Sequence, residues 1–187
     1  MKNTTYKTVL LSATLITFII AVIVSCNNMQ TPGAIAKTDS VSKGKDAQFI
    51  VKVAGINLEE IKLGQLAQQK GLTAAIKELG KMMEEDHTKA QSDLTALALK
   101  ESITIPIALD SNALNDYKKL SDLSGKDFDK QYCDMMESGH KDAIALFEKE
   151  VTDASDSAIR QMAAETLPTL KKHLEHVTMC QQKSGGM

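Results

Sequence analysis

The chain has 187 residues, a formal net charge of −2 and an aromatic content of only 4%, with no tryptophan. A chain so close to neutral lacks the basic surface with which proteins bind nucleic acid, and few aromatic side chains are available for base stacking. Length and composition therefore indicate one globular domain that does not bind nucleic acid.

The first 25 residues have the three zones of a bacterial export signal. A short basic start precedes an uncharged run rich in leucine, isoleucine and valine at residues 9–24, which is short for a membrane span. Ser25 and Cys26 follow directly, and this pattern resembles the lipobox at which bacterial lipoproteins are cleaved and acylated. We therefore expect residues 1–25 to be removed and Cys26 to carry the lipid. An uncleaved anchor helix and plain secretion are the alternatives.

The residues after Cys26 predict where the lipid places the protein. Asn27 follows the cysteine, whereas aspartate there would favour inner-membrane retention under familiar Gram-negative sorting rules, so the pattern favours the outer membrane, on either face. Residues 26–45 are rich in Ser, Thr, Gly, Asn and Lys and predict a flexible tether that spans roughly 20–25 Å. The membrane is thus a predicted partner through the lipid, and the sequence does not identify a protein partner.

Residues 46–182 carry the spacing of apolar residues that is typical of helices. This spacing divides them into amphipathic segments at about residues 46–70, 72–100, 124–153 and 155–182. A short helix is expected at 112–121, within the long connection between the second and third segments. Short links join the other pairs, so the sequence predicts an all-α, ferritin-like four-helix bundle in which one long crossover connects two hairpins. A disordered tail is expected at 183–187.

Three local features refine this prediction. The segment 102–112 has strand-like residues but contains Pro106 and lacks a partner strand, so we expect a loop laid over apolar surface. Pro168 is expected to kink or interrupt the last helix. Ser155 is the expected cap at the start of that helix.

Each long segment places one potential metal ligand on its apolar stripe, and these residues are Glu60, His87, His140 and His173. Because apolar stripes face one another in a bundle, the four side chains could bind a divalent transition-metal ion. Glu84 and Glu137 are weaker candidates. Each precedes a histidine by three residues, which places both groups on one helix face, as in di-iron carboxylate bundles.

The alternative is that the histidines are buried polar residues, hydrogen-bonded across the bundle with Glu60 and Asp86 as partners. Paired methionines at 82–83 and 135–136 are more typical of core packing than of a copper site. No nucleophile elbow, phosphate-binding loop or zincin motif is present, so no enzymatic activity is predicted.

Two cysteines remain after the predicted lipidation site. An antiparallel hairpin about a turn at 153–157 places His140 opposite His173 and Cys133 opposite Cys180. In the oxidising compartment that the signal implies, Cys133 and Cys180 are candidates for a disulfide. Two separate buried thiols are the alternative, because a small error in register would place the two Cα atoms too far apart for a disulfide.

A family resemblance rests on the stretches FIVKVAGINLEEIKLGQLAQQKG (49–71), FDKQYCDMMESGHKDAIALFEKE (128–150) and LPTLKKHLEHV (167–177). They resemble the domain of unknown function numbered 4142, whose members are described as outer-membrane proteins with a ferritin-like bundle. The strongest matching positions are Glu60, Asp86, His87, Phe128, Asp129, Tyr132, His140, Leu167, Pro168 and His173. The resemblance implies the bundle and an envelope location, but no reaction. The two cysteines are not associated with the family pattern.

The leading functional interpretation is a non-enzymatic envelope lipoprotein whose bundle binds a partner or protects the envelope under stress. The second is a metal-binding bundle, with or without redox activity. A third, binding of a lipid or other amphiphile between the helices, predicts an apolar cavity and is favoured by no sequence feature.

Overall fold

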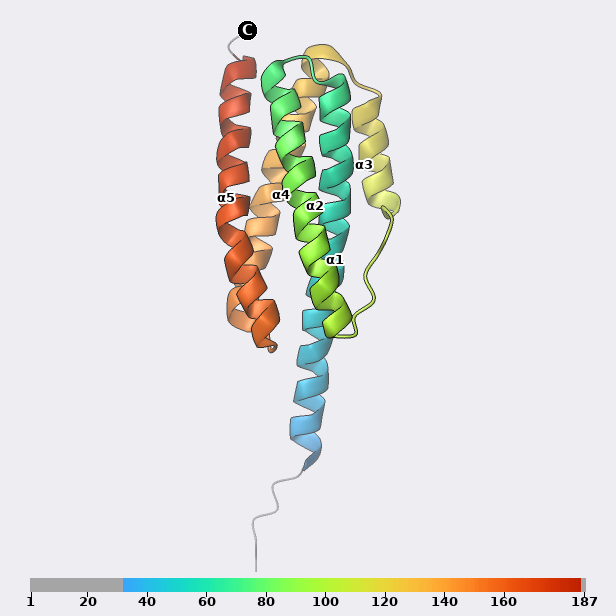
Figure 1. The fold of residues 1–187 in the computed structure, drawn as a ribbon, viewed down its shortest axis with the longest axis vertical. Coiled ribbons are helices and arrows are strands. Elements are labelled where there is room, and N and C mark those ends of the chain that lie inside the picture. The colour runs from blue at the N-terminus through green and yellow to red at the C-terminus, as the bar shows by residue number, and fades with distance from the viewer. Residues whose placement is uncertain (1–31, 186–187) are drawn as a thin grey trace, which may run out of the picture. The chain divides into compact units, whose positions relative to one another are not determined.

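A computed structural model describes residues 32–185 of the chain. The helices in this part are α1 (Pro32–Lys70), α2 (Ala74–Lys100), α3 (Ser111–Ser121), α4 (Gly125–Asp153) and α5 (Ser157–Gly185). The four long helices run side by side as two hairpins, α1–α2 and α4–α5, and the connection between the hairpins contains α3 (Figure 1). The predicted all-α bundle is therefore confirmed. The signal segment and Cys26 lie outside the described residues.

Two helix ends differ from the prediction. α1 begins at Pro32, so residues 32–45, which the composition assigned to a tether, are helical. Proline is favourable at the first position of a helix, and the alanines and lysines that follow are good helix formers. α5 likewise continues to Gly185, past the predicted bundle end at residue 182, and it is not interrupted at Pro168. No helix within residues 32–185 is long and apolar enough to cross a membrane.

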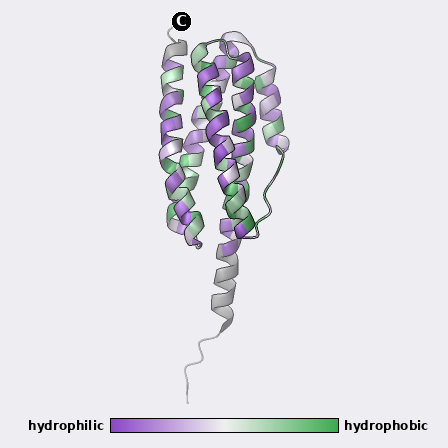
Figure 2. Ribbon diagram, viewed as in Figure 1, coloured by the Kyte–Doolittle hydropathy of each residue, from purple (hydrophilic) through white to green (hydrophobic). Residues whose placement is uncertain are grey.

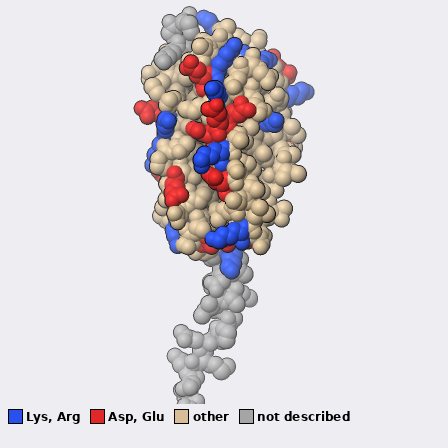
Figure 3. Space-filling model, in the orientation of Figure 1, with Lys and Arg blue, Asp and Glu red and all other residues tan. Residues whose placement is uncertain are grey.

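The long helices are amphipathic, with hydrophobic and hydrophilic residues mixed along each (Figure 2). Acidic and basic side chains lie interspersed on the face drawn in Figure 3. Many of the surface charges form pairs four residues apart, such as Lys81–Glu85 and Lys89–Asp93 on α2. The mixture of signs on this face agrees with the near-neutral net charge.

Two glycines allow α1 and α2 to pack closely. A Cβ atom on Gly64 would lie 2.6 Å from the Gly80 carbonyl oxygen, and one on Gly80 would lie 2.7 Å from the Ala67 Cβ. Both distances are too short for real side-chain contacts, so this crossing requires glycine at both positions.

The apolar core consists of two clusters. One contains Leu63, Met83, Met136 and Val177, and the other contains Ala54, Leu94, Ala143 and Leu170, each with further neighbours. On every long helix, the residues between these cluster members include a buried polar side chain, namely Glu60, His87, His140 or His173. A polar layer therefore separates the two halves of the core.

The connection at residues 101–110 is neither helix nor strand, as predicted. Ile103 and Ile105 are half-buried against the core, whereas Ile107 is exposed. The short helix α3 follows, and its Leu120 is fully buried in the core. This connection thus covers apolar surface of the bundle.

Two buried aspartates tie the hairpins together at the ends. Asp46 on α1 accepts three hydrogen bonds from residues 155–156, in the α4–α5 turn. Asp129 on α4 accepts three hydrogen bonds from residues 72–73, in the α1–α2 turn. Each hairpin therefore supplies the acceptor for the free backbone N–H groups in the turn of the other.

The start of α5 corrects one prediction. Asp156, not Ser155, accepts the hydrogen bonds from the first backbone N–H groups of the helix, those of Ala158 and Ile159. Ser155 instead donates its hydroxyl to Asp46. The expected cap is therefore displaced by one residue, because the serine is engaged in the contact between hairpins.

Candidate metal centre

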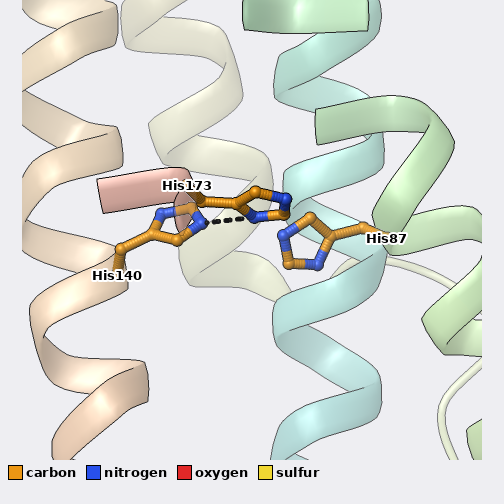
Figure 4. Close-up of side chains that lie close together, drawn as sticks. All are labelled: His87, His140 and His173. Atoms are coloured by element: carbon orange, nitrogen blue, oxygen red, sulfur yellow. Dashed lines mark hydrogen bonds between the residues drawn. The ribbon is translucent and has the colours of Figure 1, made fainter. Parts of the chain in front are cut away.

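Three histidines from three helices meet in the polar layer. The side chains of His87 on α2, His140 on α4 and His173 on α5 point toward one another (Figure 4). One ring nitrogen from each lies within 4.8 Å of the others, and the side chains are at most 4% exposed. The shortest separation is 3.1 Å, between His140 Nε2 and His173 Nδ1. The predicted opposition of His140 and His173 is confirmed.

The other nitrogen of each ring contacts a hydrogen-bond acceptor. These contacts join His140 Nδ1 to the Met136 carbonyl, His173 Nε2 to Asp86 Oδ2 and His87 Nδ1 to Asn57 Oδ1, each at 2.9 Å. Because a carbonyl or carboxylate oxygen only accepts, the ring nitrogen facing it carries the proton. The amide of Asn57 donates to Gln91, which leaves its oxygen as the acceptor toward His87.

These protons leave lone pairs on the three nitrogens that face one another. His140 Nε2 and His173 Nδ1 lie at hydrogen-bonding distance, which is the dashed line in Figure 4, but with these tautomers both are acceptors and no proton lies between them. His87 Nε2 is buried and has no hydrogen-bond partner among the described residues. A tetrahedral zinc ion with Zn–N distances of about 2.0–2.1 Å holds its nitrogens roughly 3.3–3.4 Å apart. The separation of 3.1 Å is close to that value.

Burial keeps the three rings neutral. It lowers the pKa of His87 to about 3 and that of His140 to about 4, with the neighbouring histidines adding to both shifts. It also lowers the pKa of His173, although Asp86 opposes this shift. At neutral pH the facing nitrogens are therefore free to bind a cation without first losing protons.

A comparison with known families finds a match to the domain of unknown function DUF4142 over residues 30–179. The chain belongs to the DUF4142 family. Among solved structures, it is similar to the crystal structure of a DUF305 fragment from Deinococcus radiodurans, with a TM-score of 0.64 and 11% identity. The alignment covers 76% of this chain and 96% of that one, and at this identity it shows the fold alone. A search of curated proteins gives no match.

In this DUF4142 domain Glu60 lies beside the histidines without joining their ligand group. Its Oε1 is 3.9 Å from His140 Nδ1, the nitrogen that faces away from His173. Its Oε2 has no partner among the described residues, and burial raises its pKa to about 8. The hydroxyl of Tyr132 is also buried without a described partner, and burial followed by the charge of Glu60 raises its pKa. Glu60 is thus protonated at neutral pH.

The two Glu-x-x-His glutamates point elsewhere. Glu84 accepts hydrogen bonds from Gln65 at 2.8 Å and Gln68 at 2.6 Å, both on α1. Glu137 accepts one from Gln181 on α5 at 2.8 Å. Neither is grouped with the histidines, because these carboxylates lie at the edge of the buried stripe, within reach of neighbouring glutamines.

Cys133 and Cys180 of the DUF4142 domain belong to one apolar cluster, and Cys180 Sγ donates to the Ala75 carbonyl at 3.7 Å. Burial, followed by Cys180, raises the pKa of the Cys133 thiol to about 12, which makes that thiol unreactive at neutral pH. No disulfide joins Cys133 and Cys180 in this structure, so the predicted bond is not formed here.

Sequence reasoning missed two of the acceptors that orient the histidines. Asn57 interrupts the apolar stripe of α1 one turn before Glu60, and this spacing is a signal that could have identified it. The carbonyl of Met136 belongs to the backbone, so no residue type marks it. Asp86 was recognised as a partner of the histidines.

Proposed function

We propose that this DUF4142 domain binds a divalent transition-metal ion through His140 Nε2, His173 Nδ1 and His87 Nε2. The observation that carries the proposal is the 3.1 Å separation of two nitrogens that both present lone pairs. Two buried acceptors in contact destabilise a fold, since each lacks a donor. A cation bound by both nitrogens removes that cost.

The donor set indicates the class of ion. Imidazole nitrogens suit zinc, copper, iron and nickel, whereas calcium and magnesium prefer oxygen ligands. Three protein ligands with one position left open are typical of catalytic rather than structural zinc sites. The contacts of the histidines with Asp86, Asn57 and the Met136 carbonyl have the role of second-layer partners, which fix the tautomer and orientation of metal-binding rings.

This proposal is favoured over a purely partner-binding role because binding at the surface leaves the buried lone pairs unexplained. When bound, such an ion acts as a Lewis acid and makes its coordinated water more acidic. The protein contributes a buried set of neutral ligands and one nearby carboxylate, Asp86.

Titration calorimetry with Zn²⁺ and Co²⁺ on chelator-treated protein tests the proposal. We expect one ion per chain in the wild type, and an affinity about a hundredfold weaker or worse in His140→Ala, which removes a ligand. His176→Ala is the matched control, because His176 lies on α5 outside the histidine group. Circular dichroism verifies that both variants are folded. No bound ion, or equal affinity in the two variants, contradicts the proposal.

We also propose, from the sequence alone, that the domain is attached to the outer membrane through a lipid on Cys26. The support is the lipobox-like pattern that ends at this cysteine. Fatty-acid labelling in a Gram-negative host is expected to mark the wild type and not Cys26→Ser. Equal labelling of both proteins contradicts the anchor and leaves the metal proposal unaffected.

A further inference from the structure

A cavity of about 360 Å³ lies between the two hairpins, directly beside the histidine group. His87 and His173, two of the three proposed ligands, form part of its wall together with their partners Asn57 and Asp86. Much of the remaining wall is apolar and is formed by Val53, Ile56, Leu94, Phe147 and Leu170. This volume falls in the range of pockets that hold small molecules.

Small side chains contribute to the cavity. Ala90 on α2 and Ala143 on α4 line it, together with Thr166 and Thr169 on α5. Longer apolar residues at these positions would fill the space between the hairpins, as they do in close-packed interiors. The cavity thus follows from the choice of residues in the wall as well as from the helix arrangement.

The charges around the cavity restrict what can bind there. Asp86, Asp93 and Glu165 are its acidic lining residues. Lys89 is the basic residue of the lining, and it is paired with Asp93 at 2.6 Å. The described lining therefore presents no unpaired cation to an anionic ligand, unless a metal ion supplies one.

A divalent ion on three neutral histidines carries two positive charges. Asp86 balances one of them, because it is the acidic lining residue that contacts a ligand, His173, whereas Asp93 is paired with Lys89 and Glu165 is exposed. Net charge in a buried site is unfavourable, so the remaining charge favours a ligand with one negative charge. The apolar wall favours a hydrocarbon body attached to that charge.

We propose, building on the metal site proposed above, that the cavity holds a small amphiphilic monoanion. Its carboxylate-like head binds the open position of the metal ion, and its apolar body of a few carbon atoms lies against Val53, Leu94 and Phe147. Metal and cavity act together: the ion supplies the positive charge that the lining lacks, and the wall selects the hydrocarbon chain.

Cobalt-loaded protein gives a direct test, because the visible absorption bands of Co²⁺ respond to a change in its ligands. We titrate the loaded wild type with acetate, butanoate and hexanoate, and with hexanol as the uncharged counterpart. We expect affinity to rise by about tenfold or more from acetate to hexanoate, since each buried methylene adds to binding. Hexanol should leave the bands unchanged, and metal-free protein should not bind hexanoate in calorimetry.

A pair of variants on α2 distinguishes the contribution of the cavity to ligand binding from that of the metal. Ala90→Leu fills the cavity, whereas Ala96→Leu makes the same change at an exposed position outside the lining. We expect Ala90→Leu to weaken hexanoate binding about tenfold with acetate binding unchanged, and Ala96→Leu to behave as the wild type.

Equal affinity for acetate and hexanoate in the wild type overturns the cavity proposal, and so does an unchanged hexanoate affinity in Ala90→Leu. Either result leaves the metal site standing, because cobalt is still bound. Failure to bind cobalt at all overturns both proposals. The chain-length series uses only the wild type, so it decides the question even if Ala90→Leu does not fold.

Discussion

The ends of the bundle and the polar layer in its middle, called the middle layer below, differ in whether their buried polar groups have hydrogen-bond partners. At the ends, Asp46 and Asp129 are buried and accept three hydrogen bonds each from the turns of the opposite hairpin. In the middle, His140 and His173 present lone pairs to each other, and His87 Nε2 has no described partner. The chain itself supplies the hydrogen-bond partners of the buried aspartates at the ends, whereas it does not supply those of the histidine nitrogens in the middle.

The difference separates a structural role from a binding role. A satisfied buried carboxylate stabilises the fold, whereas a buried acceptor without a donor costs about 1–3 kcal/mol. Four buried side-chain atoms of the described part lack partners; two belong to the middle layer, on Glu60 and His87, and a third to Tyr132 near Glu60. The fourth, on Glu150, is outside this group. Glu60 lies on the far side of His140, whereas His87 Nε2 belongs to the group with the facing lone pairs of His140 and His173; unsatisfied groups at that point favour a ligand that the chain itself does not supply.

Removing an end carboxylate should have the largest effect on stability. Asp129→Ala leaves two turn N–H groups and the Thr73 hydroxyl without their acceptor, so we expect a loss of about 2–3 kcal/mol in the free energy of unfolding. Metal affinity should stay unchanged. Chemical denaturation measures the loss, and Asp142→Ala, at an exposed site on the same helix, is the control. A loss no greater than that of the control would remove the distinction between ends and middle.

Replacing a polar side chain in the middle layer should instead raise the free energy of unfolding of the metal-free protein. His140→Leu replaces one of two facing acceptors by an apolar group, and the Met136 carbonyl it leaves lies within a helix. We expect the metal-free variant to be about 1–2 kcal/mol more stable than the metal-free wild type, although it no longer binds metal. Denaturation with a chelator present provides the measurement, with His176→Leu as control. A large destabilisation would show that the histidines are structural.

Glu60 should make stability depend on pH. Its pKa is about 8 in the folded protein against 4.5 ordinarily, so it stabilises the fold below pH 4.5 and this contribution is lost as the pH rises toward 8. Glu60→Gln does not titrate, and we expect it to exceed the wild type by on the order of 1 kcal/mol at pH 7. Thermal unfolding from pH 4.5 to 8 should show the gap widening with pH. A constant gap would mean that Glu60 is ionised in the folded state.

The smallest expected effect is that of pH on the affinity for the metal. The pKa values of His87 and His140, about 3 and about 4, leave both rings neutral throughout the range from pH 6 to 8. Burial also lowers the pKa of His173, so protons compete little with the metal, and we expect affinity to change by less than about threefold across this range. Calorimetric titration at pH 6, 7 and 8 measures it. A steep fall toward pH 6 would indicate that the rings titrate as exposed histidines do.

The sequence was sufficient to predict the hairpins and the opposition of His140 and His173, because apolar spacing and a short turn determine which residues face each other. The sequence was not sufficient to predict which side chains form the ligand group. Glu60 has the spacing of an inward residue, yet its carboxylate lies on the far side of His140. That outcome depends on side-chain rotamers, which helical spacing does not specify.

The histidine tautomers could not be predicted from the sequence either, since one of them depends on the backbone carbonyl of Met136. The glutamates of both Glu-x-x-His motifs were also misleading. Glutamines on neighbouring helices bind Glu84 and Glu137, and such pairing between helices becomes visible only when the helices are packed.

X-ray absorption spectroscopy of the zinc-loaded domain tests most directly the claim that the middle layer is a metal site. We predict three imidazole nitrogens at about 2.0–2.1 Å from the metal, with one further light atom in the open position. The signals of the imidazole rings should be reduced in His140→Ala and retained in His176→Ala. A first shell of oxygen atoms alone, without imidazole scattering, would contradict the account.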